Sequence, residues 1–490
     1  MVKNAQKNTT KKNKVSYKNK RNYAKLRRWV VPAVFGAALS ALAFAPTFAA
    51  TVEQSPSVSN AVTQQQQMPT TQADAESMPT NTPPNGNPPP GNPPKGMPNA
   101  PQPEANPGTF TGTSVITENQ TVSHEFVTST TADQNALIGK NGATVNVIGC
   151  ELDKTGNTTS DDNSNFRGQN AIVLSIEGSQ INIKDSNITS NANGSNALFA
   201  TGEGSVINVE NANIHTKGNS SRGLDATYKG IVNGKDLTIT TEGDHSATLA
   251  TDRGEGTINA DSAKLTTSGS GSPVIYSTGN ITANNINGEA RNSEIGVVEG
   301  KNSITLTNST VTGYKDNGFM LYQSFSGDAE SGIARLKAEN NTLTTLSTGA
   351  FLYVNNTTAE ANLTNNAISM PNTTTLVKSA ADTRWGKAGE NGGHLKLRTS
   401  NQALNGNILA DSISSVALDM TNGSSLVGAI NPDNASKNVT VKLSKDSSWV
   451  LTGDSYVTSI ENEDTTGANI SLNGYKLVVA GKKKKKKKKK

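Results

Sequence analysis

Residues 181–214 read INIKDSNITSNANGSNALFATGEGSVINVENANI. The alternation of apolar and polar residues in Ile181-Asn182-Ile183 is followed by a polar bend and then by Ile188. The same pattern returns in Ile207-Asn208-Val209, which is followed by Ile214. Because alternation sends every second side chain to one face of a β-strand, each copy predicts a short strand, a bend and a second short strand.

Further copies recur along the chain, and most successive copies start 21 to 26 residues apart. They begin at Val145, Ile181, Ile207, Val232, Ile258, Ile281, Ile304, Leu336, Ala361, Leu395, Val416, Val439 and Ile470. Additional alternating stretches lie between copies, at 197–201, 246–251, 273–278, 295–299 and 318–322. A fixed repeat of this length is one coil of a solenoid, whereas an antiparallel sandwich would place hairpin turns every 8 to 12 residues. We therefore predict an all-β fold, a single-stranded right-handed parallel β-helix of about 12–13 coils.

The regions outside the repeats differ in composition. Residues 1–28 hold eleven basic residues and no acid, and an apolar run from Trp29 to about Pro46 ends at small residues before Ala50. This order predicts a secretory signal peptide over 1–49, with an uncleaved membrane anchor as the alternative. Residues 51–109 contain 14 of the 19 prolines. The remaining predicted regions are a disordered linker over 50–110, the β-helix over 111–481 and a poly-Lys tail over 482–490.

The net charge of +5 hides an acidic body. Of the 45 basic residues, eleven precede residue 29 and nine form the tail, which leaves 25 against 40 acidic residues. This balance argues against nucleic acid as a partner, because neutralising phosphates requires clustered Lys and Arg. The single cysteine, Cys150, allows no internal disulfide. We expect it to be a small buried side chain in the first coils, with a reactive thiol as the alternative.

Several stretches appear in an order that is similar to a known group of proteins. They include ATLATDRG at 247–254, SPVIYSTG at 272–279, VVEGKNSI at 297–304, DNGFMLYQSFSGD at 316–328, DTRWG at 382–386 and WVLTGDSY at 449–456. From about residue 170 to 481 the chain resembles bacterial and archaeal adhesin-like surface β-helix proteins. That group is similar to carbohydrate-binding β-helices of the polysaccharide-lyase-like (pectin-lyase-like) superfamily. The resemblance implies the fold more than any activity, because one such fold hosts lyases, hydrolases and inert adhesins.

Neighbouring coils would stack polar side chains at the ends of their strands. Aligning Leu249, Ile275, Val297 and Met320 places charged residues beside an aromatic ring, a surface that suits sugars. The candidate ligand-binding residues are Asp252, Arg253, Glu299, Lys301, Tyr322, Gln323, Asp328 and Trp385. The alternative is that these side chains are polar ladders that close each coil, or, for Trp385, the cap of a hydrophobic cluster. We expect Trp449 to belong to the core of the terminal coils.

These patterns predict a secreted bacterial cell-surface module, a monomer that binds a polysaccharide or cell-surface glycan without catalysis. One alternative is a polysaccharide lyase acting on acidic polysaccharide, with Arg253 or Lys301 as base, which a dense carboxylate and basic cluster on one face would favour. We expect no such cluster. Another is the passenger of a truncated autotransporter-like protein. No cofactor is expected; Ca²⁺ would have Asp161-Asp162, or Asp252 with Glu299, as ligands. The tail at 482–490 would hold the protein on an anionic cell envelope. The alternatives for the tail are an engineered addition, or a frame slip in an adenine-rich tract that truncates a longer protein.

Overall fold

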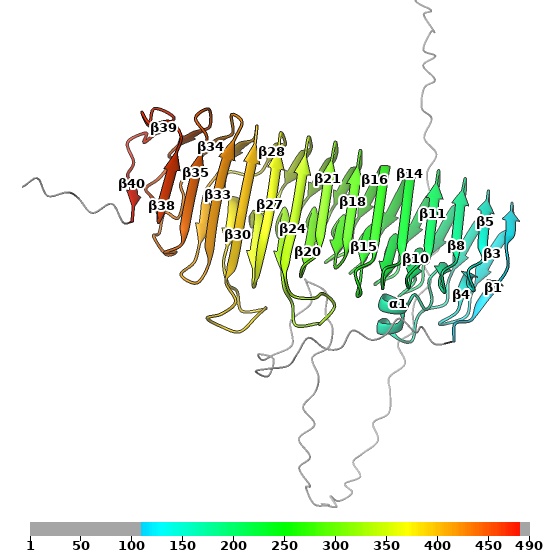
Figure 1. The fold of residues 1–490 in the computed structure, drawn as a ribbon. Helices are drawn as coiled ribbons and strands as arrows, with labels where there is room; N and C mark the ends of the chain where they lie inside the picture. Colours follow the sequence, from blue (N-terminus) through cyan, green and yellow to red (C-terminus); the bar gives the residue numbers. More distant parts are fainter. Residues whose placement is uncertain (1–108, 481–490) are drawn as a thin grey trace, which may run out of the picture. The chain divides into compact units, whose positions relative to one another are not determined.

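The computed structural model describes residues 109–480, and they form an all-β parallel solenoid of about 15 turns (Figure 1). The predicted signal peptide over 1–49, nearly all of the predicted linker over 50–110 and the tail over 482–490 lie outside the described residues. The first strand begins at Gly112, close to the predicted start of the β-helix. Every strand pair that the registers define is parallel, as a solenoid requires (for example, β10 with β13).

One side of the solenoid is a 12-stranded sheet, called sheet A here. In spatial order its strands are β1 (Gly112–Ile116), β4 (Asn135–Gly139), β7 (Val173–Ser175), β10 (Leu198–Thr201), β13 (Leu224–Thr227), β15 (Leu249–Thr251), β17 (Ile275–Ser277), β20 (Gly296–Glu299), β23 (Phe319–Tyr322), β26 (Ala350–Asn355), β29 (Thr375–Ser379) and β32 (Ile408–Ala410).

The second sheet, sheet B, has 22 strands that follow two parallel ladders. The first ladder contains β2 (Gln120–Ser123), β5 (Thr144–Ile148), β8 (Gln180–Lys184), β11 (Val206–Glu210), β14 (Ile231–Thr241), β16 (Thr257–Thr267), β18 (Asn280–Asn284), β21 (Ser303–Thr307), β24 (Ile333–Glu339), β27 (Thr357–Thr364), β30 (Gly393–Ser400), β33 (Ser415–Thr421), β35 (Val439–Leu443) and β38 (Ser459–Asn462). The second contains β3 (Phe126–Ser129), β6 (Glu151–Lys154), β9 (Asn187–Ser190), β12 (Asn213–Thr216), the later halves of β14 and β16, β19 (Asn287–Ala290), β22 (Thr310–Gly313), β25 (Thr342–Thr345) and β28 (Ala367–Ser369).

Two small sheets complete the C-terminal turns. They contain β31 (Ala403–Asn405), β34 (Ser425–Val427), β36 (Ser448–Val450) and β39 (Ile470–Ser471) in one sheet, and β37 (Ser455–Val457) with β40 (Leu477–Val479) in the other. The only helix among the described residues is α1 (Asp161–Arg167), between β6 and β7. Ser160 caps its first turn and Gly168, at φ 78°, ends it.

The strands of sheet B bend where Asn and Asp residues adopt positive φ. Asp185, Asn211 and Asp236 have φ of 52°, 50° and 53°, and they separate the first ladder from the second. Short polar side chains tolerate this left-handed conformation better than other non-glycine residues. The polar bend in the repeat pattern is therefore the element that turns each coil.

The core consists of apolar side chains stacked from turn to turn. Leu198, Leu224 and Leu249 occupy one register position of sheet A, and all three are fully buried. Each buried side chain of this size contributes about 1.5–3 kcal/mol. Cys150 is buried in the same core, and Trp449 is fully buried, where its indole N–H donates a 2.9 Å hydrogen bond to the carbonyl of Gly428. Both core predictions are confirmed.

The repeat spacing is also confirmed, but the coil count was too low. Val206 pairs with Ile231, Ile231 with Thr257 and Thr257 with Asn280, which are steps of 25, 26 and 23 residues. The repeat pattern missed β2 and β38, because QTVS and SIEN each have one apolar side chain instead of two. Ile470 starts no coil of the first ladder: it lies in β39 and pairs with Trp449.

A series of glycines lets adjacent turns approach closely in the segment that precedes each sheet A strand. A Cβ on Gly243 would lie 1.9 Å from the carbonyl oxygen of Gly218, and a Cβ on Gly269 would lie 1.8 Å from that of Gly243. These distances are far below van der Waals contact, so no larger residue fits without moving the backbone. The sequence keeps glycine at this position in three successive turns (Gly218, Gly243 and Gly269).

Candidate functional site

The outer side of sheet A carries a cluster of charged and aromatic side chains, which we call the loop-flanked face. Two long loops, 323–332 after β23 and 380–392 after β29, project beside it (Figure 1). One row of outward residues crosses six strands in register. This row contains Asp225, Ala250, Tyr276, Val297, Met320 and Tyr353. Glu299 and Tyr322 pair with each other at the next outward position, two residues after Val297 and Met320.

Glu299 is the centre of a hydrogen-bond network on this face. The phenols of Tyr276 and Tyr322 donate to its Oε2 at 2.9 and 2.7 Å, and Ser324 donates to its Oε1. Its side chain is buried, and burial together with nearby Asp328 raises the pKa of Glu299. The three hydroxyls oppose this rise, because they stabilise the ionised carboxylate.

A second group combines carboxylates and guanidinium groups. Arg222 Nε lies 2.9 Å from Asp252 Oδ2 and 3.9 Å from Asp225 Oδ2, and both carboxylates are almost fully buried. Arg253 Nε lies 2.5 Å from Asp328 Oδ1, and the guanidinium of Arg253 lies 3.6 Å from the ring centroid of Phe166 in α1. Arg253, just after β15, therefore connects helix α1 with loop 323–332.

Burial sets the protonation of these acids. It raises the pKa of Asp252 to about 6, against the opposing effect of Arg222. It also raises the pKa of Asp225 well above its ordinary value, and the neighbouring charge of Asp252 adds to that rise. Acids with raised pKa values can hold a proton near neutral pH.

An aromatic cluster joins the face to loop 380–392. The ring of Trp385 lies 5.5 Å from that of Tyr322 and 6.3 Å from that of Phe325, measured between centroids. Tyr353 donates a 3.1 Å hydrogen bond to Asp382 Oδ2 at the start of the same loop. Since Trp385 is only 2% exposed, its position favours the interpretation as the cap of a hydrophobic cluster over that of an open stacking platform.

The rim of the face is more exposed. Lys301 Nζ lies 2.6 Å from Glu255 Oε1 and 2.7 Å from Glu330 Oε2, and the side chain of Lys301 is 37% exposed. Gln323 donates a 3.2 Å hydrogen bond to the carbonyl of Ala329 within loop 323–332. The eight candidate residues from the sequence thus come together on one side of the solenoid, where most of them pair with each other or with near neighbours.

The predicted alignment of the strands was wrong by one residue at one step. Ile275 pairs with Gly296 instead of Val297, whereas Leu249 pairs with Ile275 and Val297 pairs with Met320 as predicted. Gly296 and Phe319 face the core, whereas Val297 and Met320 face outward. An apolar residue on both faces removes the alternation that would have fixed the register.

The expectation that no dense cluster of carboxylates and basic groups forms on one face was also wrong. Four acids (Asp225, Asp252, Glu299 and Asp328) and two arginines converge on the loop-flanked face. Sequence reasoning missed Arg222, Asp225, Tyr276 and Ser324. Tyr276 lies in a strand that was recognised, and its outward position follows from the alternation around Ile275 and Ser277. Arg222 gave no signal, because it precedes its strand.

The described residues hold no group of three or more His, Cys, Asp or Glu side chains arranged for a metal ion. Asp161 and Asp162, considered as calcium ligands, lie in the first turn of α1, where acids interact favourably with the helix dipole. Asp252 and Glu299 are engaged by Arg222 and by hydroxyl groups instead. Within residues 109–480 there is no helix with the length and apolar character needed to cross a membrane.

Comparison with known proteins found no matching family model, no matching curated protein and no matching solved structure.

Proposed function

We propose that this protein is a secreted cell-surface β-helix that binds a glycan on the loop-flanked face without catalysis. The observation that carries the proposal is the convergence of acids, arginines and aromatic rings from separate turns beside two long loops. Sugar recognition uses this combination, because charged and amide groups bond hydroxyls and aromatic rings pack on apolar sugar faces. The resemblance to adhesin-like and pectin-lyase-like β-helices agrees with this function.

Binding without catalysis is favoured because the acids are already engaged within the protein. Glu299 accepts four hydrogen bonds from side chains, and Asp252 and Asp328 each pair with an arginine. A general acid or base has to reach a proton of its substrate. The exposed groups that a glycan would meet first are those of the rim, and Lys301 between Glu255 and Glu330 is the one that would bond a uronate carboxylate.

A glycan array tests the proposal. The chain ending at Gly481 would be compared with the full chain, because nine lysines bind acidic polymers unspecifically. We expect selective binding of acidic polysaccharide by the shorter chain, and about a tenfold loss of affinity in Lys301→Gln. Lys445→Gln is the matched control, since Lys445 is an exposed lysine in the C-terminal turns. Absence of glycan binding, or equal loss in both variants, would rule out the loop-flanked face as the binding site.

A second candidate function is favoured by the raised pKa values of the buried acids. Asp252, with a pKa of about 6, could act as a general acid on an acidic polysaccharide. Incubation with polygalacturonate and other acidic polymers would test this, with chain cleavage as the readout. Cleavage that is abolished by Asp252→Asn would replace the binding proposal with an enzyme, and intact polymer would exclude that reaction.

Localisation and retention rest on segments outside the described residues. The predicted signal over 1–49 supports secretion, and the predicted partner of the tail at 482–490 is the anionic cell envelope. Release of the chain ending at Gly481 from cells at low ionic strength, while the full chain stays bound, is the expected result. Retention of both chains would show that the tail is not the anchor.

A further inference from the structure

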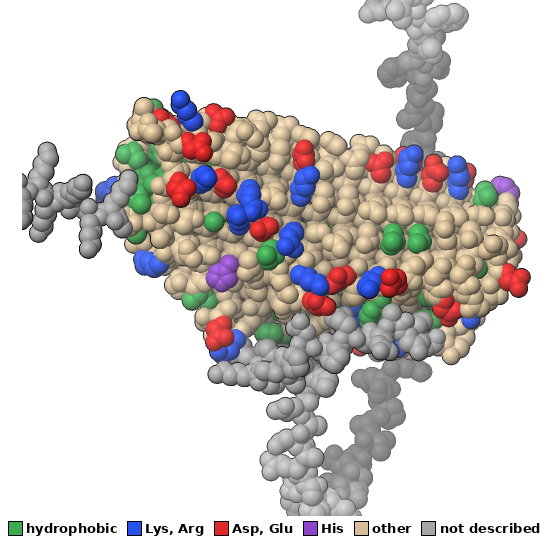
Figure 2. All heavy atoms as spheres, in the orientation of Figure 1, with side chains coloured by type: hydrophobic (Ala, Val, Ile, Leu, Met, Phe, Trp, Pro, Cys, Tyr) green, Lys and Arg blue, Asp and Glu red, His purple; other side chains and the backbone are tan. Residues whose placement is uncertain are grey.

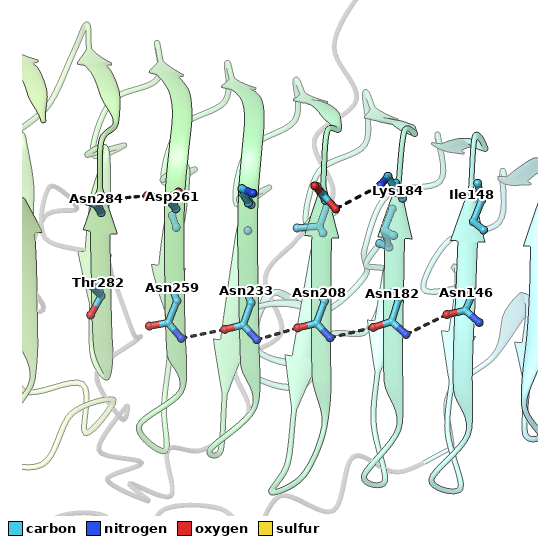
Figure 3. A pocket seen from close by; sticks show the side chains of 16 residues that line it. Asn146, Ile148, Asn182, Lys184, Asn208, Asn233, Asn259, Asp261, Thr282 and Asn284 are labelled. Atoms are coloured by element: carbon cyan, nitrogen blue, oxygen red, sulfur yellow. Dashed lines mark hydrogen bonds and ion pairs between the residues drawn. The ribbon is translucent and has the colours of Figure 1, made fainter. Parts of the chain in front are cut away.

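The outer side of sheet B carries a continuous ladder of five asparagines. Their amide groups are joined by hydrogen bonds of 2.8 to 3.0 Å, each from the Nδ2 of one turn to the Oδ1 of the turn before. The ladder contains Asn146, Asn182, Asn208, Asn233 and Asn259, which lie in one line across β5, β8, β11, β14 and β16 (Figure 3). This line is perpendicular to the strands and parallel to the direction in which the turns stack.

The ladder lies in an open hollow of about 700 Å³ on this side of the solenoid (Figure 3). A second row of outward residues borders it, at the position two residues further along each strand. That row contains Ile148, Lys184, Glu210, Lys235, Asp261 and Asn284. The hollow ends at β18, and two turns later the register position of the asparagines is occupied by Lys337.

Each amide keeps hydrogen-bonding capacity that the ladder does not use. A side-chain amide has two N–H donors and two lone pairs on its oxygen, and a link in the ladder uses one of each. Asn208 and Asn233 therefore each present one further donor and one further acceptor. Asn182 presents one further donor only, because its oxygen also accepts a 2.9 Å hydrogen bond from Gln180 Nε2. These groups repeat at the strand spacing of about 4.7–4.9 Å.

The charges around the hollow balance each other, and acidic and basic side chains alternate along this edge of the molecule (Figure 2). Lys184 Nζ lies 3.6 Å from Glu210 Oε2, and Lys235 Nζ lies 4.0 Å from Asp236 Oδ2. The ladder itself is uncharged. The hollow therefore offers no excess of positive charge to a polyanion such as nucleic acid, and an uncharged ligand fits it.

We propose that the asparagine ladder binds an extended, neutral, β-1,4-linked polysaccharide that lies along the solenoid axis. A partner that bonds five identical groups in a line has to repeat as they do, and one sugar unit of an extended chain has about the length of one turn spacing. Its hydroxyls both donate and accept, which matches the unused capacity of each amide. The exposed side chain of Ile148 provides an apolar contact at one end. This site is separate from the loop-flanked face and takes a different class of glycan.

Titration calorimetry of the full chain with defined oligosaccharides tests the proposal. The probes are cello-, xylo- and manno-oligosaccharides of two to six units, with maltohexaose as a coiled control. We expect affinity to rise with length up to about five units, because five amides contribute, and maltohexaose to bind at least tenfold more weakly. Binding that is independent of length, or the same for maltohexaose, would overturn the proposal.

Variants locate the binding. Asn208→Ala interrupts the ladder at its centre, and we expect at least a tenfold loss of affinity for the hexasaccharides. Asn362→Ala is the matched control, because Asn362 occupies the same register row outside the hollow, between Lys337 and Arg398. Thermal unfolding of each variant shows whether it is folded, and Asn208→Gln provides a second substitution that keeps an amide but displaces it. Unchanged affinity in Asn208→Ala, or equal loss in Asn362→Ala, would overturn the proposal.

The outcome is distinguishable from that of the proposed function. Lys301→Gln should leave the binding of neutral hexasaccharides unchanged, because Lys301 belongs to the rim of the loop-flanked face on sheet A. Loss of neutral binding in that variant would place the neutral glycan on the loop-flanked face and overturn the ladder proposal. Failure of acidic glycans to bind would leave the ladder proposal intact.

Discussion

The phenol of Tyr322 donates a 2.7 Å hydrogen bond to the carboxylate of Glu299, its register partner on the neighbouring turn, and both side chains are about 1% exposed. Tyr276 lies on the neighbouring turn on the other side of Glu299 and donates to the same oxygen at 2.9 Å. A carboxylate bonded from both sides connects three consecutive turns through their outer surface. This connection is additional to the backbone ladder of sheet A.

Tyr322→Phe should weaken the folded state. Removing one donor to a buried carboxylate costs about 1–3 kcal/mol, and the pKa of Glu299 should rise further because the lost hydrogen bond lowered it. Thermal unfolding at pH 8 measures the loss, with Tyr475→Phe as the control because Tyr475 is 42% exposed. A variant as stable as the wild type would show that the hydroxyl is replaced by another donor.

The buried side chain of Glu294 should give the stability of the fold an unusual pH dependence. Its side chain is 1% exposed, Ser293 donates a 2.7 Å hydrogen bond to it, and burial raises its pKa from 4.5 to about 7. The raised pKa means that the folded state holds the proton more tightly than the unfolded state. The stability that this group contributes is therefore fully present below about pH 4.5 and is lost as pH rises through about 7.

Glu294→Gln should remove this loss. We expect the free energy of unfolding of the variant to exceed that of the wild type by on the order of 3 kcal/mol at pH 8. The variant should therefore unfold at a higher temperature than the wild type at pH 8, and at nearly the same temperature at pH 5. Scanning calorimetry at both pH values measures the difference. An equal effect at pH 5 and pH 8 would show that the substitution acts through packing instead of protonation.

Arg222 balances two buried acids. Arg222→Leu leaves Asp225 and Asp252 without their cation, which should cost about 3–5 kcal/mol at pH 8. The cost should be smaller at pH 5, because Asp252, with a pKa of about 6, is then mostly protonated. Denaturant unfolding at the two pH values checks this, and the exposed Arg335→Leu is the control. A loss that does not change with pH would contradict the ionic explanation.

Gly243 tests the close approach of turns. A Cβ at this position would lie 1.9 Å from the carbonyl oxygen of Gly218, so Gly243→Ala has to shift the backbone of one turn. We expect a loss larger than the roughly 1–2 kcal/mol that Gly178→Ala should cost, because Gly178 has a φ of 71° but no atom within 4 Å of its Cβ position. Soluble yield and the unfolding temperature of both variants provide the comparison.

The sequence predicted most of the solenoid because its alternation is local. Ile181, Ile207 and Val232 lie in adjacent turns at the predicted positions, since each strand has a complete apolar-polar-apolar pattern. The pattern is incomplete at the ends, where β2 and β38 have one apolar residue each, and so those turns were missed.

The sequence predicted only part of the charged and aromatic cluster on the loop-flanked face. Asp252, Glu299 and Tyr322 were identified because they lie at the ends of alternating strands, and a solenoid brings such positions together. Their partners Arg222, Tyr276 and Ser324 were not predicted. The pairing of Arg253 with Asp328, both of them predicted candidates, was not predicted either, because it spans 75 positions of sequence through a loop whose path has no repeat. Burial was also not predictable, since it depends on α1 and the two loops covering the outer side of sheet A.

The strictly sequential stacking of turns has a mechanical consequence. Each turn is held mainly by its two neighbours, so a load applied to the two ends of the solenoid is met first by a terminal turn and then by the next one. Releasing one turn of 23 to 26 residues adds on the order of 80 Å of extended chain. Under tension, such a stack lengthens in discrete steps and dissipates the work of pulling one turn at a time, in the manner of an extensible tether.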